Sequence, residues 1–319
     1  EMMELPHIED PAVFLTGLGK TSELAKKQLY ILKTKEGEAL ALRPDGRISS
    51  ARAYIQNGFA DLPQPVKLTY QGSMFRHDVT ERGWYREFHQ WGLELFGEES
   101  AVGDATIMQV LFTTLAELGV KDIFIHVNSL GCKECRQVIR TQIGAYYRSK
   151  FAKICRSCRF KLKESPLKVL ECRDEKCALI KEHAPNIVDH LCEKCKTHFK
   201  QVLEFLDESK IPYILNPYLV KGVDYYTRTV FEVFVAEDPN VAQPKKDSEV
   251  LAIGSGGRYD NLVEALGGNP APAVGGTLGI QRVMQIIRER GVRVPNPPRP
   301  RVILIQLGDL AKRKSLTLM

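Results

Sequence analysis

Eight cysteines lie close together in the chain, spaced as metal ligands are spaced. They form four close pairs: Cys132 and Cys135, Cys155 and Cys158, Cys172 and Cys177, Cys192 and Cys195. A Cys-x-x-Cys knuckle presents two thiolates to one tetrahedral metal ion. Three such knuckles and one Cys-x4-Cys pair supply enough ligands for two four-cysteine zinc sites. The sequence leaves open which pairs would share an ion.

Disulfide bonds are the alternative use of these cysteines. The rest of the chain lacks cysteine, as is typical of proteins of the cytosol, and this favours reduced thiols. Redox chemistry of the thioredoxin type would require a βαβ context that the pattern does not offer. His183, His190 and His198 lie in the same stretch and are possible replacement ligands, although surface or core positions are commoner for such histidines.

The cysteine-rich stretch is also strongly basic. From Cys132 to Lys200 there are 17 Lys and Arg against 8 Asp and Glu, a net charge of +9, whereas the rest of the chain carries −3 and the whole chain +6. A basic module on a mildly acidic body favours a polyanionic partner such as RNA. A solvated lysine-rich surface is the alternative.

A second group of chemically capable residues lies between Phe75 and Glu94. Phe88, Gln90 and Glu94 alternate as on the returning strand of a hairpin, and Arg76 lies near the end of the first strand. The inward face of such a hairpin would display cationic and acidic side chains together. A site that holds a phosphate beside an ammonium or imidazole group needs that mixture. A structural hairpin held by salt bridges is the alternative.

Further segments combine glycines with polar and aromatic residues. The paired tyrosines Tyr225 and Tyr226 can form the wall of a pocket and offer hydroxyl groups to a polar ligand. Residues 254–260 read as a glycine-rich turn that allows close approach of a ligand to the backbone, although the spacing fits neither a Walker nor a dinucleotide motif. In residues 273–282, glycines pack against a helix start that delivers Arg282.

Hydrophobic periodicity predicts the elements that position these residues. Strands are predicted at residues 40–44, 66–70, 121–127 and 225–236, and helices at 50–57, 104–118, 198–209 and 279–289. Asp45 and Arg47 would point to one side of a strand-like segment.

The same pattern divides the chain into four parts. Residues 1–130 and 199–294 form an α+β core, residues 131–198 an inserted helical module, and residues 295–319 a proline-rich linker with the start of another αβ domain. In that last part, residues 301–307 are predicted as a buried strand and Asp309 as the start of a helix. The apolar runs are shorter than the roughly 18 residues of a membrane span, and residues 1–10 are too acidic for a signal peptide. We therefore expect a cytoplasmic protein without membrane contact.

In chain order these segments resemble the class II aminoacyl-tRNA synthetases, and among them the histidyl-tRNA synthetases. Residues 75–94 resemble motif 2 and residues 275–282 motif 3, while residues 221–232 and 256–260 resemble two motifs specific to the histidyl enzymes. Residues 43–46, 52–55 and 62–68 resemble the same family. Pro6 stands where motif 1 ends, which implies that the dimer-forming helix of motif 1 would precede residue 1.

The resemblance implies an antiparallel sheet flanked by helices, in a homodimer. It also implies a histidine–tRNA ligase, which forms histidyl-adenylate from histidine and ATP with Mg²⁺ and transfers the histidyl group to histidine tRNA. By its position the cysteine module resembles the family's insertion domain, which implies contact with the acceptor arm of the tRNA.

The resemblance also implies roles for single residues. For ATP, it implies that Arg76 and Arg282 hold the phosphates, Phe88 stacks on adenine, Asp78 contacts adenine, and Lys221 stabilises the reacting α-phosphate. The catalytic residues would then be Lys221, Arg76 and Arg282. For histidine, it implies that Glu94 and Tyr226 read the imidazole, Gln90 holds the α-amino group, Asp45 and Arg47 lie beside the α-ammonium, and Tyr259 lines the pocket.

Several of these positions depart from the family pattern. The family usually has glutamate where Asp45 stands, threonine where Arg47 stands, and arginine where Lys221 and Trp84 stand. Lysine keeps the charge of arginine but loses its bidentate fork. Because Arg47 brings a cation toward an ammonium site, we expect it to turn away and pair with Asp45, Glu94 or a phosphate.

Two non-catalytic alternatives remain open from the sequence. One is a paralogue like the regulatory subunit of ATP phosphoribosyltransferase, and the other is an RNA-binding protein that has kept the basic module. The ligase is favoured over both alternatives by three features: residues 226–231, residues 88–90 and the large insertion.

Overall fold

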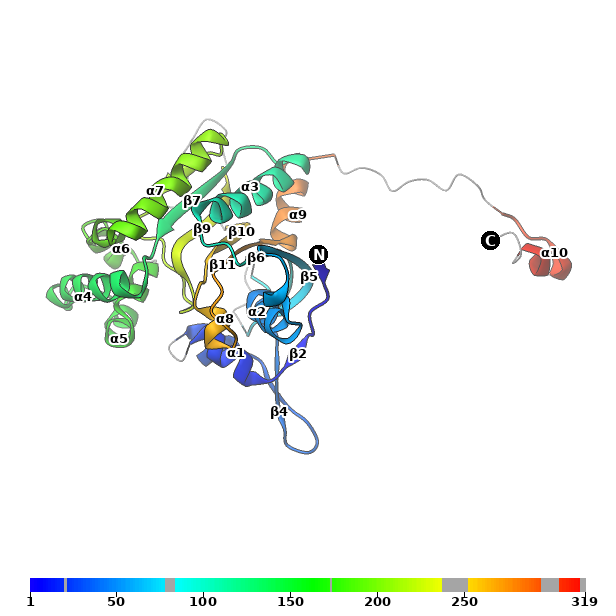
Figure 1. The fold of residues 1–319 in the computed structure, drawn as a ribbon, viewed down its shortest axis with the longest axis horizontal. Coiled ribbons are helices and arrows are strands. Elements are labelled where there is room, and N and C mark those ends of the chain that lie inside the picture. The colour runs from blue at the N-terminus through cyan, green and yellow to red at the C-terminus, as the bar shows by residue number, and fades with distance from the viewer. Residues whose placement is uncertain (20–21, 78–83, 173, 237–251, 294–303, 316–319) are drawn as a thin grey trace.

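The computed structural model describes residues 1–19, 22–77, 84–172, 174–236, 252–293 and 304–315. At the centre of these residues lies an eight-stranded sheet (Figure 1). In spatial order its strands are β1 (Met2–Met3), β5 (Val66–Phe75), β6 (Glu87–Phe96), β11 (Ala273–Gly279), β10 (Gly254–Arg258), β9 (Thr227–Val235), β7 (Ile123–Ser129) and β8 (Tyr213–Leu215). Neighbouring strands are antiparallel except for the two edge pairs, β1 with β5 and β7 with β8. The predicted antiparallel sheet flanked by helices is confirmed.

Strands β5 and β6 form the hairpin that the sequence predicts. Their register pairs Val66 with Phe96 at one end and Phe75 with Glu87 at the other. Because side chains alternate along a strand, Phe88, Gln90 and Glu94 share one face of β6. The hairpin therefore delivers these side chains to one side of the sheet, while Asp78 lies outside the described residues.

Two hydrophobic clusters hold helices against the sheet. One joins the sheet to helices α3 (Ala101–Glu117), α7 (Glu193–Glu208) and α9 (Ile280–Glu289). The other joins it to helices α1 (Pro11–Leu18), α2 (Gly46–Gln56) and α8 (Leu262–Ala265) and continues into the cysteine module. Short elements complete the core: a three-stranded sheet of β2 (Ile8–Glu9), β4 (Ala39–Leu42) and β3 (Ile31–Lys33), the π-helical turn η1 (Leu24–Gln28) and the 3₁₀ turn η2 (Phe59–Asp61).

The cysteine module is helical, as the sequence predicts. It comprises α4 (Lys133–Ser149), α5 (Arg156–Glu164), η3 (Pro166–Glu171), α6 (Glu175–Lys181), η4 (Ile187–His190) and the first turns of α7. Helices α4, α5 and α6 extend from one side of the core (Figure 1). Helix α7 is continuous across the predicted boundary between residues 198 and 199, so it belongs to both the module and the core. None of the helices among the described residues is long and apolar enough to cross a membrane.

Some local predictions are wrong. The segment of Asp45 to Arg47 is the start of α2 and not a strand, because the Asp45 carboxylate accepts the backbone N–H of Arg47 and caps the helix. Residues 254–258 form strand β10 and not a turn, and residues 273–279 form strand β11 before the predicted helix. Glycines serve these strands because a Cβ on Gly256 would lie 2.3 Å from the carbonyl oxygen of Gly275 on the neighbouring strand.

The end of the chain also differs from prediction. Residues 304–307 are exposed and form no strand, and Ile305 and Leu307 are 78% and 84% exposed. No sheet edge among the described residues pairs with them, whereas a buried strand needs such pairing. The helix predicted from Asp309 is present as α10 (Gly308–Ser315). The predicted proline-rich linker, residues 295–300, lies outside the described residues.

Candidate active site and metal centres

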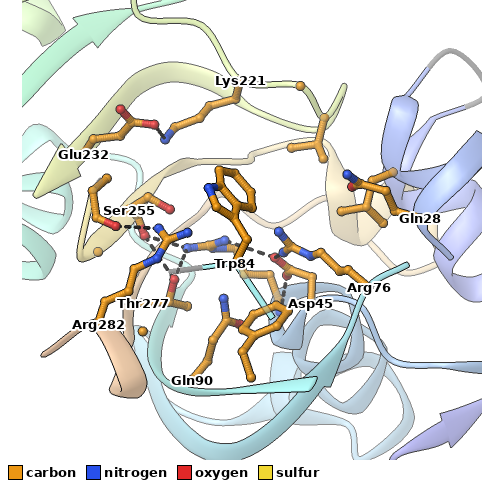
Figure 2. Close-up of a pocket in the computed structure, with 18 of the residues that line it drawn as sticks. Gln28, Asp45, Arg76, Trp84, Gln90, Lys221, Glu232, Ser255, Thr277 and Arg282 are labelled. Atoms are coloured by element: carbon orange, nitrogen blue, oxygen red, sulfur yellow. Dashed lines mark hydrogen bonds and ion pairs between the residues drawn. The ribbon is translucent and has the colours of Figure 1, made fainter. Parts of the chain in front are cut away.

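A cavity of about 400 Å³ opens on the face of the sheet that carries Gln90 (Figure 2). The β5–β6 hairpin, the start of α2, the loop before β9 and the start of α9 all contribute to its wall. Of the residues predicted for the site, these line the cavity: Asp45, Arg47, Arg76, Phe88, Gln90, Lys221, Tyr226 and Arg282. Residues from position 45 to position 282 of the chain are thus brought together around one cavity.

Arg47 lies in the base of the cavity between two carboxylates. Its Nη1 is 3.3 Å from Asp45 Oδ2, and its Nε is 3.7 Å from Glu94 Oε1. Its Nη2 donates to the carbonyl oxygen of Ser255 at 2.9 Å, and its guanidinium lies 5.6 Å from the ring centroid of Tyr226. Burial alone would lower the pKa of Arg47, but the surrounding tyrosines and carboxylates raise it well above the usual value. Arg47 is therefore a fully charged, buried cation.

Glu94 is held behind the cavity by two hydroxyl groups. Tyr259 donates to Glu94 Oε2 at 2.5 Å, and Tyr70 donates to Glu94 Oε1 at 3.1 Å. Burial raises the pKa of Glu94 to about 7, against the opposing effect of Arg47. A Cβ on Gly275, the cross-strand neighbour of Glu94, would lie 1.5 Å from Glu94 Oε2, so the carboxylate requires glycine there.

The predicted pocket residue Tyr259 is thus fully buried behind Glu94 instead of lining the cavity. Sequence reasoning missed Tyr70, whereas Tyr225, named there as one of the paired tyrosines, does line the cavity. Tyr70 stands opposite Gly92, and a Cβ on Gly92 would meet the Tyr70 ring at 2.3 Å. This fit of a large ring over a glycine depends on strand register, which the sequence does not display.

Cations surround the outer part of the cavity, and each already has a partner in the chain. Arg76 donates to the carbonyl oxygen of Pro44 at 2.9 Å, and its guanidinium lies 5.1 Å from the ring centroid of Phe88. Arg282 donates to a backbone carbonyl at 2.6 Å and lies 5.1 Å from a ring centroid of Trp84. Lys221 Nζ is 2.6 Å from an oxygen of Glu232, on the other side of the pocket from Gln90 (Figure 2).

The eight cysteines gather into two groups of four. We name them the proximal cluster (Cys132, Cys135, Cys192 and Cys195) and the distal cluster (Cys155, Cys158, Cys172 and Cys177). In each cluster all four sulfur atoms lie within 4.8 Å of one another, and the closest measured pairs are 3.5–3.9 Å apart. Four sulfurs at about 2.3 Å from one zinc ion would lie about 3.8 Å apart, whereas a disulfide bond measures about 2.05 Å. The structure thus brings the first cysteine pair together with the fourth, and the second pair together with the third.

The surroundings of both clusters suit thiolates. Backbone N–H groups point at sulfur: that of Cys192 at Cys135 Sγ over 3.0 Å, and that of Cys155 at Cys177 Sγ over 3.3 Å. The Tyr147 hydroxyl is buried without a hydrogen-bond partner among the described residues. Burial raises its pKa, and the nearby thiols of the distal cluster raise it further.

An antiparallel sheet that carries such a hairpin, with an arginine at the start of the helix after its last strand, defines the catalytic core of a class II aminoacyl-tRNA synthetase. The family model for histidyl-tRNA synthetase matches residues 1–283. The chain belongs to the histidyl-tRNA synthetase family.

Similar proteins bear out this assignment. The histidine–tRNA ligase of Caldicellulosiruptor saccharolyticus is 38% identical over 313 residues, which are 98% of this chain and 73% of the relative. That of Pelotomaculum thermopropionicum is 37% identical over 314 residues, or 98% and 72%. The apo histidyl-tRNA synthetase of S. aureus has a TM-score of 0.75 at 28% identity and covers 100% of this chain and 73% of its own.

A further structure, from Bacillus halodurans, is described as an ATP phosphoribosyltransferase regulatory subunit/histidyl-tRNA synthetase. Its TM-score is 0.60 at 21% identity, over 90% of this chain and 74% of its own, so it shows the shared fold alone. The relatives that are more similar in sequence are named histidine–tRNA ligases, so the comparisons do not favour the non-catalytic paralogue.

Proposed function

We propose that this chain is a histidine–tRNA ligase that activates histidine with ATP at the cavity described above. The observation that carries the proposal is the polar base of the cavity. Glu94 is fixed just behind this base by two tyrosine hydroxyls. Gln90, four residues earlier on the same face of β6, lines the cavity, and its Oε1 is buried without a hydrogen-bond partner among the described residues. A buried carboxylate and an unused carbonyl acceptor suit an imidazole N–H and an α-ammonium group.

The proposed chemistry is an in-line displacement at the α-phosphorus of ATP, which binds as its magnesium complex. A carboxylate oxygen of histidine forms the new bond to phosphorus, the bond to the bridging oxygen breaks, and pyrophosphate leaves. Arg76 and Arg282 would exchange their backbone and aromatic partners for phosphate oxygens, and Lys221 would leave Glu232 for the α-phosphate. Such steps are driven mainly by positioning and by cations placed where charge develops.

Histidine-dependent exchange of labelled pyrophosphate into ATP tests the proposal. We expect exchange that requires histidine and that Glu94→Ala abolishes. A chain that binds neither histidine nor ATP would refute it and would support a non-catalytic paralogue. The homodimer and the cytoplasmic location stay predictions, and sedimentation velocity tests the first.

We also propose that each cysteine cluster holds one zinc ion. The sulfur separations support this, and so does the Tyr147 hydroxyl. It is buried beside the distal cluster with no hydrogen-bond partner in the described part of the chain, so it is well placed to donate to metal-bound thiolates. Burial raises the pKa of Cys132 and of Cys177 to about 11 each, so zinc binding would release protons from such thiols. The ions would be structural, because four protein ligands close each site.

Metal analysis of the chain purified without added zinc measures this directly. We expect close to two ions per chain, and a content well below one would exclude both sites. Matched variants separate the clusters: Cys195→Ser and Cys158→Ser should each remove one ion and leave the other.

Finally, we propose that the basic module supplies most of the affinity for tRNA. Two four-thiolate zinc sites at about −2 each would still leave its net charge near +5. Deletion of residues 132–195 should abolish salt-sensitive tRNA binding, while pyrophosphate exchange should persist when histidine is supplied at saturating concentration. Unchanged tRNA affinity after the deletion would show that the charge is only a solvated surface.

A further inference from the structure

The proximal cluster lies where the module joins the core, and a side chain next to it reaches the wall of the amino-acid pocket. Arg136 directly follows Cys135 on α4. Its guanidinium donates to the carbonyl oxygen of Asp224 at 3.1 Å and to that of Tyr226. The planar guanidinium can serve two carbonyls at once. Since Tyr225 and Tyr226 both line the cavity, Arg136 fixes the turn that presents them.

A second link leads from the other half of the proximal cluster to the buried residues behind the pocket. His198 lies one helical turn after Cys195 on α7, and its Nε2 is 3.3 Å from Asp104 Oδ2. Asp104 is fully buried and binds Arg258 at 2.5 Å. Arg258 directly precedes Tyr259, whose hydroxyl donates to the Glu94 carboxylate behind the cavity.

The two links meet at a third contact. Thr227, which follows the tyrosine pair, has its Oγ1 3.2 Å from Asp260 Oδ2 and accepts the backbone N–H of Asp260 at 3.1 Å. Arg258 in turn lies 3.1 Å from Asp260 Oδ1. The contacts therefore form a closed ring that passes through the backbone of Tyr226 and through Arg258, the neighbour of Tyr259. The proximal cluster closes this ring because Cys135 and Cys195 belong to the same group of four.

We propose that the proximal cluster is a structural part of the amino-acid pocket, and that Arg136 and His198 are positioning residues for Tyr226 and Tyr259. This proposal rests on the proposed function. In a buried network each contact restrains the next, so its members are held more rigidly than by separate contacts. A pocket held in its binding shape binds more tightly because less ordering remains to be done on binding. Opening the ring should therefore weaken histidine binding first and leave the phosphate end of the cavity little changed.

The test compares Arg136→Ala and His198→Ala with matched substitutions outside the ring. Arg288 on α9 and His183 after α6 are exposed, so Arg288→Ala and His183→Ala serve as controls. We expect each ring variant to weaken histidine binding about tenfold by calorimetry. In pyrophosphate exchange, KM for histidine should rise by the same factor while kcat changes little.

Conservative variants separate positioning from general stability. Arg136→Lys keeps a cationic donor within reach of the carbonyls, and His198→Gln keeps a side-chain donor for Asp104. Both should recover part of the lost affinity. The double variant Arg136→Ala with His198→Ala should lose less than the sum of the single losses, because one break already opens the ring. Cys195→Ser breaks the ring at the cluster itself and should give the same loss.

A readout without ligand keeps this test separate from the test of the proposed function. The amide of Arg228 donates to the carbonyl oxygen of Gly131 at 2.9 Å, which ties the start of β9 to the start of the module. Hydrogen exchange at this amide should be faster in every ring variant and unchanged in the controls. If the ring variants and the controls show the same rate of hydrogen exchange at this amide, the proximal cluster is independent of the pocket. If the unaltered chain binds no histidine, the proposed function fails. Hydrogen exchange at the Arg228 amide would still show whether the ring links the cluster to the pocket.

Discussion

Replacing Arg47 by threonine should strengthen the binding of histidine. The Arg47 guanidinium lies 3.3 Å from Asp45 and its Nε lies 3.7 Å from Glu94, so it uses the two carboxylates that an incoming cationic substrate would need. An ammonium drawn to the same carboxylates would come to about 4 Å from the guanidinium. At an effective dielectric constant near 20, that repulsion is about 4 kcal/mol.

Part of this gain will be offset. Without Arg47 the two carboxylates repel each other in a buried space, and Glu94, whose pKa already stands at about 7, will take up a proton more readily. We therefore expect Arg47→Thr to tighten histidine binding by about tenfold or somewhat more. Combining it with Asp45→Glu should add to the gain, because the longer side chain brings its carboxylate closer to the ligand.

Calorimetric titration with two ligands makes the measurement specific. Histidine carries the ammonium, whereas imidazole propionate has the same ring and carboxylate without it. The gain should appear for histidine and not for imidazole propionate, and histidine-dependent pyrophosphate exchange should rise with it. If Arg47→Thr weakens both ligands alike, Arg47 is a structural support of the pocket and the repulsion argument is refuted.

Three further predictions concern residues around the same cavity. Lys221→Ala should slow adenylate formation by about 10² or more with little change in histidine affinity, because a cation aimed at the reacting phosphate acts mainly in the transition state; equal losses in rate and affinity would contradict this. The pKa of Glu94 is raised from 4.5 to about 7 on folding, so the folded state binds the proton more tightly and the unfolding free energy should fall as pH rises from about 4.5 to 7; denaturant titrations should show this fall in the unaltered chain and not in Glu94→Gln. Gly275→Ala places a Cβ 1.5 Å from the Glu94 carboxylate and should destabilise the chain by about 1–3 kcal/mol, whereas Gly279→Ala on the same strand meets its nearest atom at 3.7 Å and should cost much less in a thermal melt.

The sequence predicts best those features that repeat along the chain. Alternation of Phe88, Gln90 and Glu94 predicts the hairpin because a strand has a period of two, and the close cysteine pairs predict metal-ligating knuckles because spacing alone determines whether two thiolates can face one ion. Residues 254–258 were misread as a turn since glycine is typical of turns. In the folded chain these glycines make room for neighbouring strands, and that requirement comes from register.

The position of Arg47 shows a second limit of the sequence. The residue types at 45 and 47 indicate that a cation stands close to the site expected for the substrate ammonium. Where the Arg47 guanidinium points depends on whether this segment is extended or begins a helix. As a helix cap, Asp45 turns its carboxylate back over the first turn, where it meets both the backbone N–H and the guanidinium of Arg47. The folded chain selects among the partners expected for Arg47: its guanidinium lies near both Asp45 and Glu94, the latter on strand β6.

The departures from the family pattern together shift positive charge within the cavity. The phosphate end has Trp84 where the family usually has arginine, and the amino-acid end has gained Arg47. Trp84 instead lies beneath the guanidinium of Arg282 at 5.1 Å. Restoring the family pattern at each end should therefore change different quantities: Arg47→Thr the affinity for histidine, and Trp84→Arg the affinity for ATP. Without nucleotide, an arginine at position 84 would face Arg282 and lower the melting temperature, and ATP should restore it by placing a polyanion between them. If Trp84→Arg improves ATP binding without this ligand-dependent stabilisation, the two arginines do not share the phosphates and the charge-shift argument fails.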